Sequence, residues 1–182
     1  MCNFSLKKKA EKYLIIDTHL HLSPLSNLFI ASGDENKIVS LMKEFNIKKA
    51  VFSSHSSLST VNYGTDITLR LLEEFDDFLY AYLVFNPNFS EISIKEIKKN
   101  LANKKIVGIK IHPSWHACYP YDEKYKRFFA FIEDAGLPVL THSWNPNVPN
   151  KAQRFSDPFF FEDIVKTHKN LKLILAHAGG RG

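Results

Sequence analysis

The sequence predicts an α/β fold in which parallel strands alternate with helices that cover the sheet. Short apolar runs recur about every 30 residues, which is the spacing of successive strand–helix units. The runs are almost continuously apolar, as expected for strands buried on both faces of a parallel sheet. With 182 residues, of which 45% are hydrophobic, the chain is long enough to form one domain with a sizeable core. We expect residues 1–12 to form an N-terminal tail and residues 13–182 to form this domain.

Six segments are predicted as strands because each is a short apolar run that ends in turn-forming or polar residues. They are residues 13–22, 49–55, 78–85, 106–113, 138–143 and 171–180. Between them, apolar residues at helical spacing predict helices over residues 34–45, 63–75, 90–103 and 121–135. A further helix is predicted to begin at Asp157, since Pro158 suits a first helical position. Asp34 and Ser90 are the expected N-caps, and Gly136 is the expected stop after residue 135.

The first predicted strand ends in an Asp-x-His-x-His pattern formed by Asp17, His19 and His21. Side chains alternate faces along a strand, so these three residues are expected on one side of the sheet. Two neutral imidazoles two residues apart can converge on one cation. A single histidine in an apolar segment is more often a hydrogen-bonded core or surface residue, but the pair beside an acid favours a metal site.

Four later strands also end in histidine, at His55, His112, His142 and His177. The carboxyl ends of parallel barrel strands meet at one end of the barrel, where active sites are built. We therefore expect these histidines to lie close together although they are far apart in the sequence. His116 falls outside this pattern and is expected at the surface.

The charge and the cysteine content exclude several classes of function. The formal net charge is +5, but most lysines are scattered along predicted helices beside glutamates, which does not form a phosphate-binding track. We therefore expect no nucleic-acid partner. Two cysteines, Cys2 and Cys118, are too few for a disulfide framework and fit a reducing cytoplasm. No apolar run approaches about 20 residues, and residues 1–12 lack the apolar region of a secretory signal, so we expect a cytoplasmic protein without a membrane span.

Four motifs in this order resemble the amidohydrolase superfamily. They lie at residues 17–21, 108–113, 138–142 and 173–180. The pattern is most similar to the amidohydrolase-related branch (amidohydrolase 2), which includes the aminocarboxymuconate-semialdehyde decarboxylase-like enzymes. The resemblance runs from Tyr13 to the last residue. It implies a TIM-barrel-like (β/α) metal-dependent hydrolase fold.

The resemblance also implies a metal centre. His19, His21 and His142 are the implied metal ligands. His177 resembles the strand-six histidine that handles protons for a metal-bound water in some members and binds a second metal in others. One or two divalent ions are therefore expected, with zinc favoured by the nitrogen ligands.

Further residues are candidates for binding a metal or the substrate. Lys110 shares a strand face with His112, and both are candidates for either role. In binuclear relatives a strand-four lysine bridges two metals in carboxylated form, whereas a structural or substrate-binding role for Lys110 is an equal alternative. Trp115 and Trp144 follow the strand-four and strand-five histidines and are candidates for the wall of a substrate pocket.

The sequence departs from the family pattern at its C-terminal end. The family barrel has eight strands and about 250 residues, whereas this sequence accounts for six strands. No residue here can be assigned to the strand-eight aspartate of the relatives. We therefore expect a barrel that is incomplete at the C-terminus, and that forms a homo-oligomer or is completed by a missing segment.

The leading functional hypothesis is a metal-dependent hydrolase that uses a metal-activated water on a small polar metabolite. A non-oxidative decarboxylase of a small unsaturated or aromatic acid is the alternative with the same site. A non-catalytic truncated barrel is a third hypothesis. A nuclease is disfavoured because residues 108–113 lack the glutamate that such enzymes use.

Overall fold

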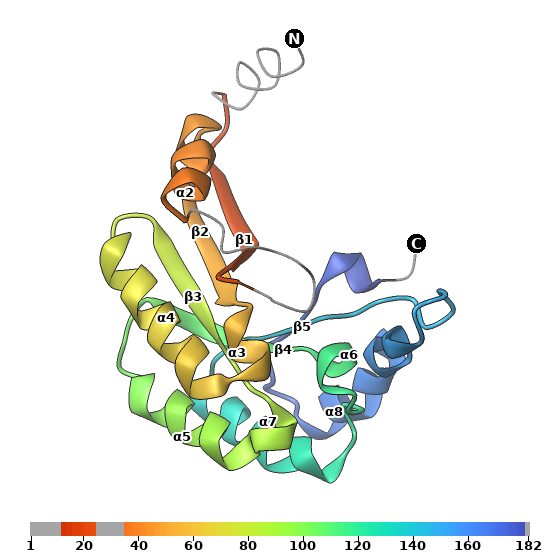
Figure 1. The fold of residues 1–182 in the computed structure, drawn as a ribbon. Coiled ribbons are helices and arrows are strands. Elements are labelled where there is room, and N and C mark those ends of the chain that lie inside the picture. Colours follow the sequence, from red (N-terminus) through yellow and green to blue (C-terminus); the bar gives the residue numbers. More distant parts are fainter. Residues whose placement is uncertain (1–11, 25–34, 181–182) are drawn as a thin grey trace.

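The computed structural model describes residues 12–24 and 35–180. Within these ranges, six parallel strands form one sheet in the order β1-β2-β3-β4-β5-β6, so each strand pairs with its neighbours in sequence. The strands are β1 (Ile15–Leu22), β2 (Ile47–Ser54), β3 (Leu79–Val84), β4 (Ile106–Ile111), β5 (Val139–Thr141) and β6 (Leu173–Leu175). The sheet curls into a partial barrel, with helices on its outer side (Figure 1). The predicted fold class is confirmed.

The helices follow the strands as predicted, with additional short turns near the strand ends. They are α2 (Glu35–Glu44), α3 (Ser56–Ser59), α4 (Val61–Glu74), α5 (Ser90–Asn100), α6 (Pro113–His116), α7 (Glu123–Ala135) and α8 (Glu162–Thr167). Four 3-10 turns join them among the described residues: η2 (Pro87–Phe89), η3 (Lys151–Ser156), η4 (Pro158–Phe161) and η5 (His177–Gly179). Within the described ranges, no helix has both the length and the apolar character needed to cross a membrane.

The predicted helix ends are only partly correct. Gly136 ends α7 in the left-handed conformation, with φ of 66°, as expected for a C-terminal glycine. Ser90 is not an N-cap, because it is the first residue of α5 and Phe89 occupies the cap position without a side-chain hydrogen bond. Asn86 instead caps the preceding turn by accepting a hydrogen bond from the backbone of Asn88. The predicted cap Asp34 lies outside the described residues, as does nearly all of the predicted tail.

The sheet is packed on both of its faces. On the outer face, strand residues such as Leu83 and Ile111 pack against the helices in one large buried cluster. The rings of Phe85 and Phe128 stack within it, with centroids 4.1 Å apart. On the inner face, a smaller buried cluster contains Val51, Tyr82, Leu140 and Ala176. This alternation along the strands sends every second side chain into the barrel interior.

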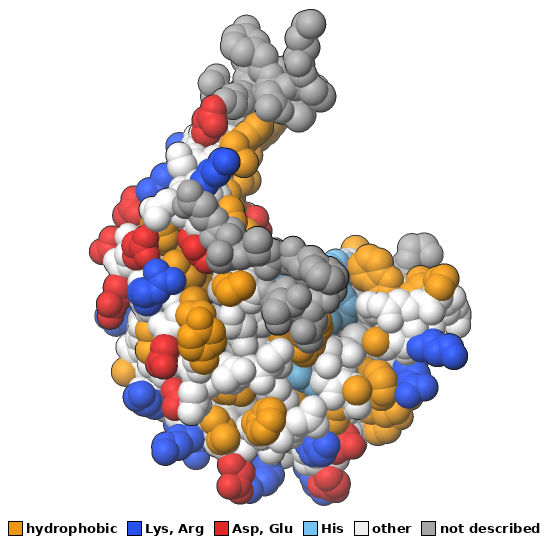
Figure 2. Space-filling view, in the orientation of Figure 1, with side chains coloured by type: hydrophobic (Ala, Val, Ile, Leu, Met, Phe, Trp, Pro, Cys, Tyr) orange, Lys and Arg blue, Asp and Glu red, His pale blue; other side chains and the backbone are white. Residues whose placement is uncertain are grey.

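Two strands are less well covered than the others. Ile16 of β1 is 52% exposed and Ile174 of β6 is 43% exposed. Within the described residues, β1 pairs only with β2 and β6 pairs only with β5. The central strands β3 and β4 have neighbours on both sides and are almost completely buried. The space-filling view shows a hollow between the two margins of the curled sheet, with histidine side chains visible at its edge (Figure 2).

Candidate metal centre

Histidines from the carboxyl ends of the strands converge inside the curled sheet, as the sequence predicts. The ring centroids of His19 and His21 are 4.9 Å apart, those of His19 and His177 are 5.4 Å apart, and those of His177 and His142 are 4.9 Å apart. Two imidazoles that bind one tetrahedral ion with Zn–N bonds of about 2.0–2.1 Å have their centroids roughly 5 Å apart. Each of these three neighbouring pairs is therefore spaced like two ligands of one metal ion.

The protonation state of these rings also fits metal binding. Burial, followed by the nearby Lys110 and His177, lowers the pKa of His19 to about 4. Burial, followed by His55 and Lys110, lowers the pKa of His21 to about 3. Burial is likewise the main cause that lowers the pKa of His142 to about 4. All three rings are therefore neutral at pH 7, and a neutral imidazole is the form that binds a metal.

The nitrogen atoms of these rings point at each other or at neighbours instead of at one centre. His142 Nδ1 lies 3.2 Å from His177 Nε2, and His19 Nε2 lies 3.1 Å from Lys110 Nζ. His21 Nδ1 contacts Ser53 Oγ at 3.1 Å. Among residues 12–24 and 35–180, no three His, Cys, Asp or Glu side chains stand ready to hold an ion. The residue types, protonation and ring spacing fit a divalent metal, and binding requires that the nitrogen atoms turn toward it.

Lys110 reaches the same cluster from the centre of the sheet. Its side chain projects from β4 and is only 1% exposed. Burial lowers the pKa of the ammonium group to about 7. In the described part of the chain its only hydrogen-bonding contact is with His19, and it forms no ion pair with an acid. A buried cation without a carboxylate is costly, so this site favours an anionic ligand.

His177 is held in an unusual backbone conformation. It follows β6 at the start of η5, with φ of 55°, and Ala178 has φ of 52°. Few residues other than glycine adopt this left-handed region, and such strain is concentrated at functional sites. Gly180 ends the turn at φ of 72°, where an added Cβ would collide with the backbone of Trp144. The predicted sixth strand is therefore wrong beyond Leu175, because the chain turns here toward the segment after β5.

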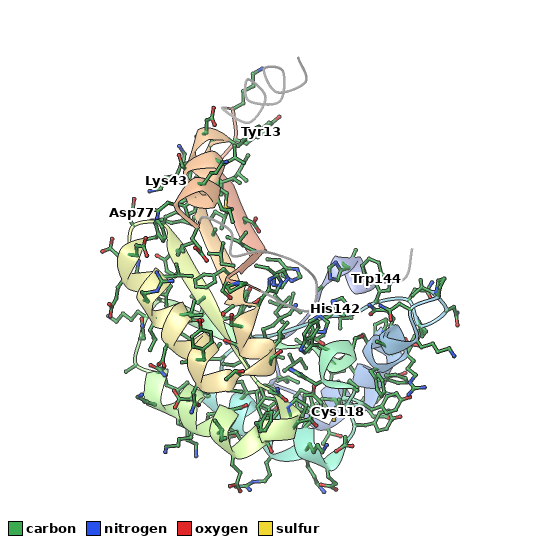
Figure 3. All side chains as sticks on the ribbon, viewed as in Figure 1. Tyr13, Lys43, Asp77, Cys118, His142 and Trp144 are labelled. Carbon is green, nitrogen blue, oxygen red and sulfur yellow. The ribbon has the colours of Figure 1, made fainter. Side chains whose placement is uncertain are left out.

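The remaining predicted site residues surround His142. The ring of His112 stacks on that of His142 at 4.1 Å and an angle of 12°. Trp144 lies on the segment after β5 next to His142, parallel to it within 6° at 6.0 Å (Figure 3). Trp144 also meets the ring of His177 edge-on at 5.0 Å. Trp115 is more distant, with its ring 6.5 Å from that of His112.

Two expectations from the sequence are corrected here. A register shift between Asp17 and Leu20 interrupts the alternation of side chains along β1. Asp17 does not join the histidines through its side chain, because its carboxylate accepts the backbone N–H of His19 at 2.9 Å. His116 is not a surface residue, since it is 5% exposed and its Nε2 bonds the carbonyl oxygen of Leu58 at 3.0 Å.

The site also contains a residue that the sequence does not mark. Gln153 lies in η3, and its Oε1 is 3.1 Å from His142 Nε2 and 3.0 Å from Ser114 Oγ. No periodic pattern or motif surrounds it, and only the fold of residues 144–156 brings it to the site. His55, noted as a strand-end histidine, stacks on His21 at 4.6 Å with an angle of 8°.

A partial barrel of parallel strands with neutral imidazoles clustered at the strand ends is typical of barrel enzymes with divalent metal centres. The chain belongs to the amidohydrolase family: the family model described as Amidohydrolase matches residues 16–181. Enzymes of this family are metal-dependent. No curated protein sequence matches the chain significantly.

Three solved structures with similar folds are named for three different reactions. A dihydroxybenzoic acid decarboxylase from Polaromonas sp. JS666, with bound manganese and an inhibitor, is 15% identical with a TM-score of 0.69, over 91% of this chain and 66% of that chain. A 4-oxalomesaconate hydratase from Rhodopseudomonas palustris is 19% identical with a TM-score of 0.65, over 92% and 64%. A probable 2-pyrone-4,6-dicarboxylic acid hydrolase from Acinetobacter baumannii is 16% identical with a TM-score of 0.60, over 92% and 59%. The chain therefore spans about two thirds or less of these three chains.

Proposed function

We propose that the chain binds a divalent metal ion through His19, His21 and His142, and that the site acts as a hydrolase on a small carboxylic acid. The observation that carries this proposal is the cluster of neutral imidazoles of His21, His19, His177 and His142, in which neighbouring rings are 4.9–5.4 Å apart, beside the buried Lys110. Family membership supports the metal, and the nitrogen ligands suit zinc as well as manganese or iron. The three proposed ligands are enough to hold one ion.

In this proposal Lys110 selects the substrate. Its buried ammonium group has no acid partner in the described chain, and a carboxylate brought by the substrate would supply one. A hydrogen bond to a charged group contributes about 1.5–3 kcal/mol. The three similar structures are named for reactions of carboxylic acids, which is consistent with an acid as the substrate of this chain.

His177 is the proposed proton carrier. Burial and the nearby Lys110 lower its pKa below 6.5, so the ring is neutral at pH 7 and ready to accept a proton. Its side chain is exposed at the edge of the cluster, where it exchanges protons with solvent. A divalent ion, when bound, lowers the pKa of water and polarises a substrate carbonyl. Trp144, beside His177, would exclude water from one side of the substrate.

Decarboxylation of an aromatic or unsaturated acid is the second candidate. It is favoured by the position of Lys110, whose Nζ is 3.1 Å from His19 Nε2, so that a bound carboxylate would lie next to a proposed metal ligand. Hydrolysis and decarboxylation require the same metal and the same lysine. They differ in their products, which are a ring-opened or cleaved acid in one case and carbon dioxide in the other.

The test begins with metal content. Purified chain loaded with zinc or manganese and then dialysed should retain about one equivalent, and His19→Ala and His142→Ala should retain less. The loaded protein is then given 2,6-dihydroxybenzoate, with carbon dioxide as the readout, and 2-pyrone-4,6-dicarboxylate, with ring opening as the readout. Lys110→Met should keep the metal and raise KM about 10–100-fold, which is the loss of one charge-assisted hydrogen bond.

The outcomes separate the hypotheses. Ring opening without carbon dioxide supports the hydrolase, and carbon dioxide supports the decarboxylase. A folded chain that binds neither metal would contradict the proposed site and favour a non-catalytic role. Lys110→Met with an unchanged KM would leave the metal site intact and exclude the role of Lys110 in substrate binding.

A further inference from the structure

The orientation of His142 is determined by two kinds of contact that act on different motions of the ring. The rings of His112 and Trp144 are parallel to the ring of His142 within 12° and 6°, respectively. This stacking fixes the plane of the imidazole. It leaves open which edge of the ring faces the cluster, because a half turn about the Cβ–Cγ bond keeps the ring in the same plane. A further contact must therefore determine which nitrogen faces the cluster.

Gln153 supplies that contact. Its Oε1 lies 3.1 Å from His142 Nε2, while His142 Nδ1 lies 3.2 Å from His177 Nε2 in the cluster. An amide oxygen only accepts hydrogen bonds, so His142 Nε2 must carry the hydrogen. Nδ1 is then the unprotonated nitrogen, which is the one that can bind a metal.

The amide of Gln153 is itself held in place by two serines. Ser114 Oγ donates to the same Oε1 at 3.0 Å. Ser156 Oγ lies 2.5 Å from Ser114 Oγ and accepts the backbone N–H of Ser114 at 3.1 Å. Both serines are buried, and the carbonyl oxygen of Ser156 accepts the backbone N–H of Trp144 at 3.0 Å. The chain of bonds thus connects helix α6, which follows β4, with the segment after β5.

From these contacts we infer that Gln153 is a positioning residue that fixes the tautomer of His142 and so presents Nδ1 to the metal centre. The inference rests on the proposed function in so far as the metal is concerned. The tautomer itself is a property of the metal-free chain. A residue that holds the second nitrogen of a ligating histidine raises the metal affinity about 10–100-fold.

The experiment measures the tautomer directly. Long-range ¹H–¹⁵N correlation spectra of metal-free protein with ¹⁵N-labelled histidine, recorded at pH 8, distinguish Nε2–H from Nδ1–H. The signals of His142 are assigned by their loss in His142→Phe. Wild type and Gln153→Glu should both show Nε2–H, because a carboxylate accepts the same hydrogen bond. Gln153→Leu should show a mixture or Nδ1–H.

Zinc titration of the same proteins gives the second readout. Gln153→Leu should bind zinc about 10–100-fold more weakly than wild type, and Gln153→Glu should bind at least as tightly. Asn147→Leu is the matched control, because it makes the same kind of change at an exposed position of the same segment. If Gln153→Leu does not fold, Gln153→Asn withdraws the carbonyl group by one methylene and is measured instead.

Two results would overturn the inference: Nδ1–H in the wild type, or a wild-type tautomer in Gln153→Leu. The predicted tautomers in a chain that binds no zinc would uphold the role of Gln153 and contradict the metal centre. Zinc binding with an unchanged tautomer in Gln153→Leu would uphold the metal centre and contradict the role of Gln153.

Discussion

The centre of the sheet and its two margins are packed differently. β3 and β4 are almost completely buried, and the helices outside them contribute stacked aromatic rings such as Phe128 on Phe85. At the margins, β1 and β6 expose apolar side chains, and β6 has three residues. Yet His19, His21 and His177 come from the margins, while Lys110 comes from the centre. Most of the packing that stabilises the fold is therefore at the centre of the sheet, whereas three of the clustered imidazoles are carried by its less well covered margins.

The largest expected effect separates the two regions by their contribution to stability. Phe128→Ala removes a fully buried ring from the centre and should lower the free energy of unfolding by about 3–5 kcal/mol. Ile174→Ala at the margin should cost about 1 kcal/mol or less, because its side chain is already partly exposed. Urea denaturation followed by circular dichroism gives both values. Equal losses at the two positions would refute the difference in packing.

A pH titration tests the centre through His116. Burial lowers its pKa from 6.5 to about 4, although the bond to Leu58 acts in the opposite direction. Below about pH 6.5 the unfolded chain therefore binds a proton that the folded chain does not, and the free energy of unfolding falls as the pH falls toward 4. At 1.36 kcal/mol per pKa unit, the full loss is about 3 kcal/mol.

His116→Gln is the matched variant, because its amide can keep the hydrogen bond to Leu58 and does not titrate. Urea unfolding at pH 7 and at pH 4.5 should show a smaller loss in the variant than in the wild type. Identical pH profiles would mean that His116 is protonated in the folded chain or exposed to solvent.

Bound zinc should reduce the difference in local stability between the β1 margin and the centre of the sheet. At a concentration of 100 times Kd, a ligand of the folded state stabilises it by about 2.7 kcal/mol. If the ion joins β1 to the end of β5 through His19, His21 and His142, amide exchange in β1 should slow about 100-fold wherever local opening requires release of the ion. Hydrogen exchange measured by mass spectrometry resolves these peptides. Unchanged exchange in β1, with zinc bound, would place the ion elsewhere.

The smallest effect on stability is expected from a charge at the exposed edge of β6. Ile174→Lys should change the free energy of unfolding by about 0.5 kcal/mol or less and should reduce self-association, because lysine on an edge strand opposes pairing between sheets. Light scattering after size-exclusion chromatography measures the association state. A wild-type chain that is monomeric at all concentrations would contradict the expected role of this edge.

The strand-end histidines could be placed from the sequence because parallel strands bring their carboxyl ends together whatever the loops do. The rings of His142 and His177, 35 residues apart, meet for this reason. Their roles as ligands and proton carriers remain proposals. The sheet order followed from the same strand–helix repetition.

The remaining features depend on tertiary contacts that have no local pattern. His116 is buried because the helices after β2 and β4 pack together, and a four-residue helix has too little periodicity to show its buried side. Gln153 reaches His142 only through the fold of the segment after β5. The turn at His177 depends on a left-handed backbone, which the sequence signals only through the glycines that follow.

The positions of the two tryptophans make the site optically distinct. The sequence contains only Trp115 and Trp144, and their rings lie 6.5 Å from His112 and 5.0 Å from His177. Ultraviolet excitation at wavelengths selective for indole therefore samples the histidine cluster and little else. The intrinsic fluorescence of the unlabelled protein should report ligand entry at this site, while events at the outer helices should leave the emission unchanged.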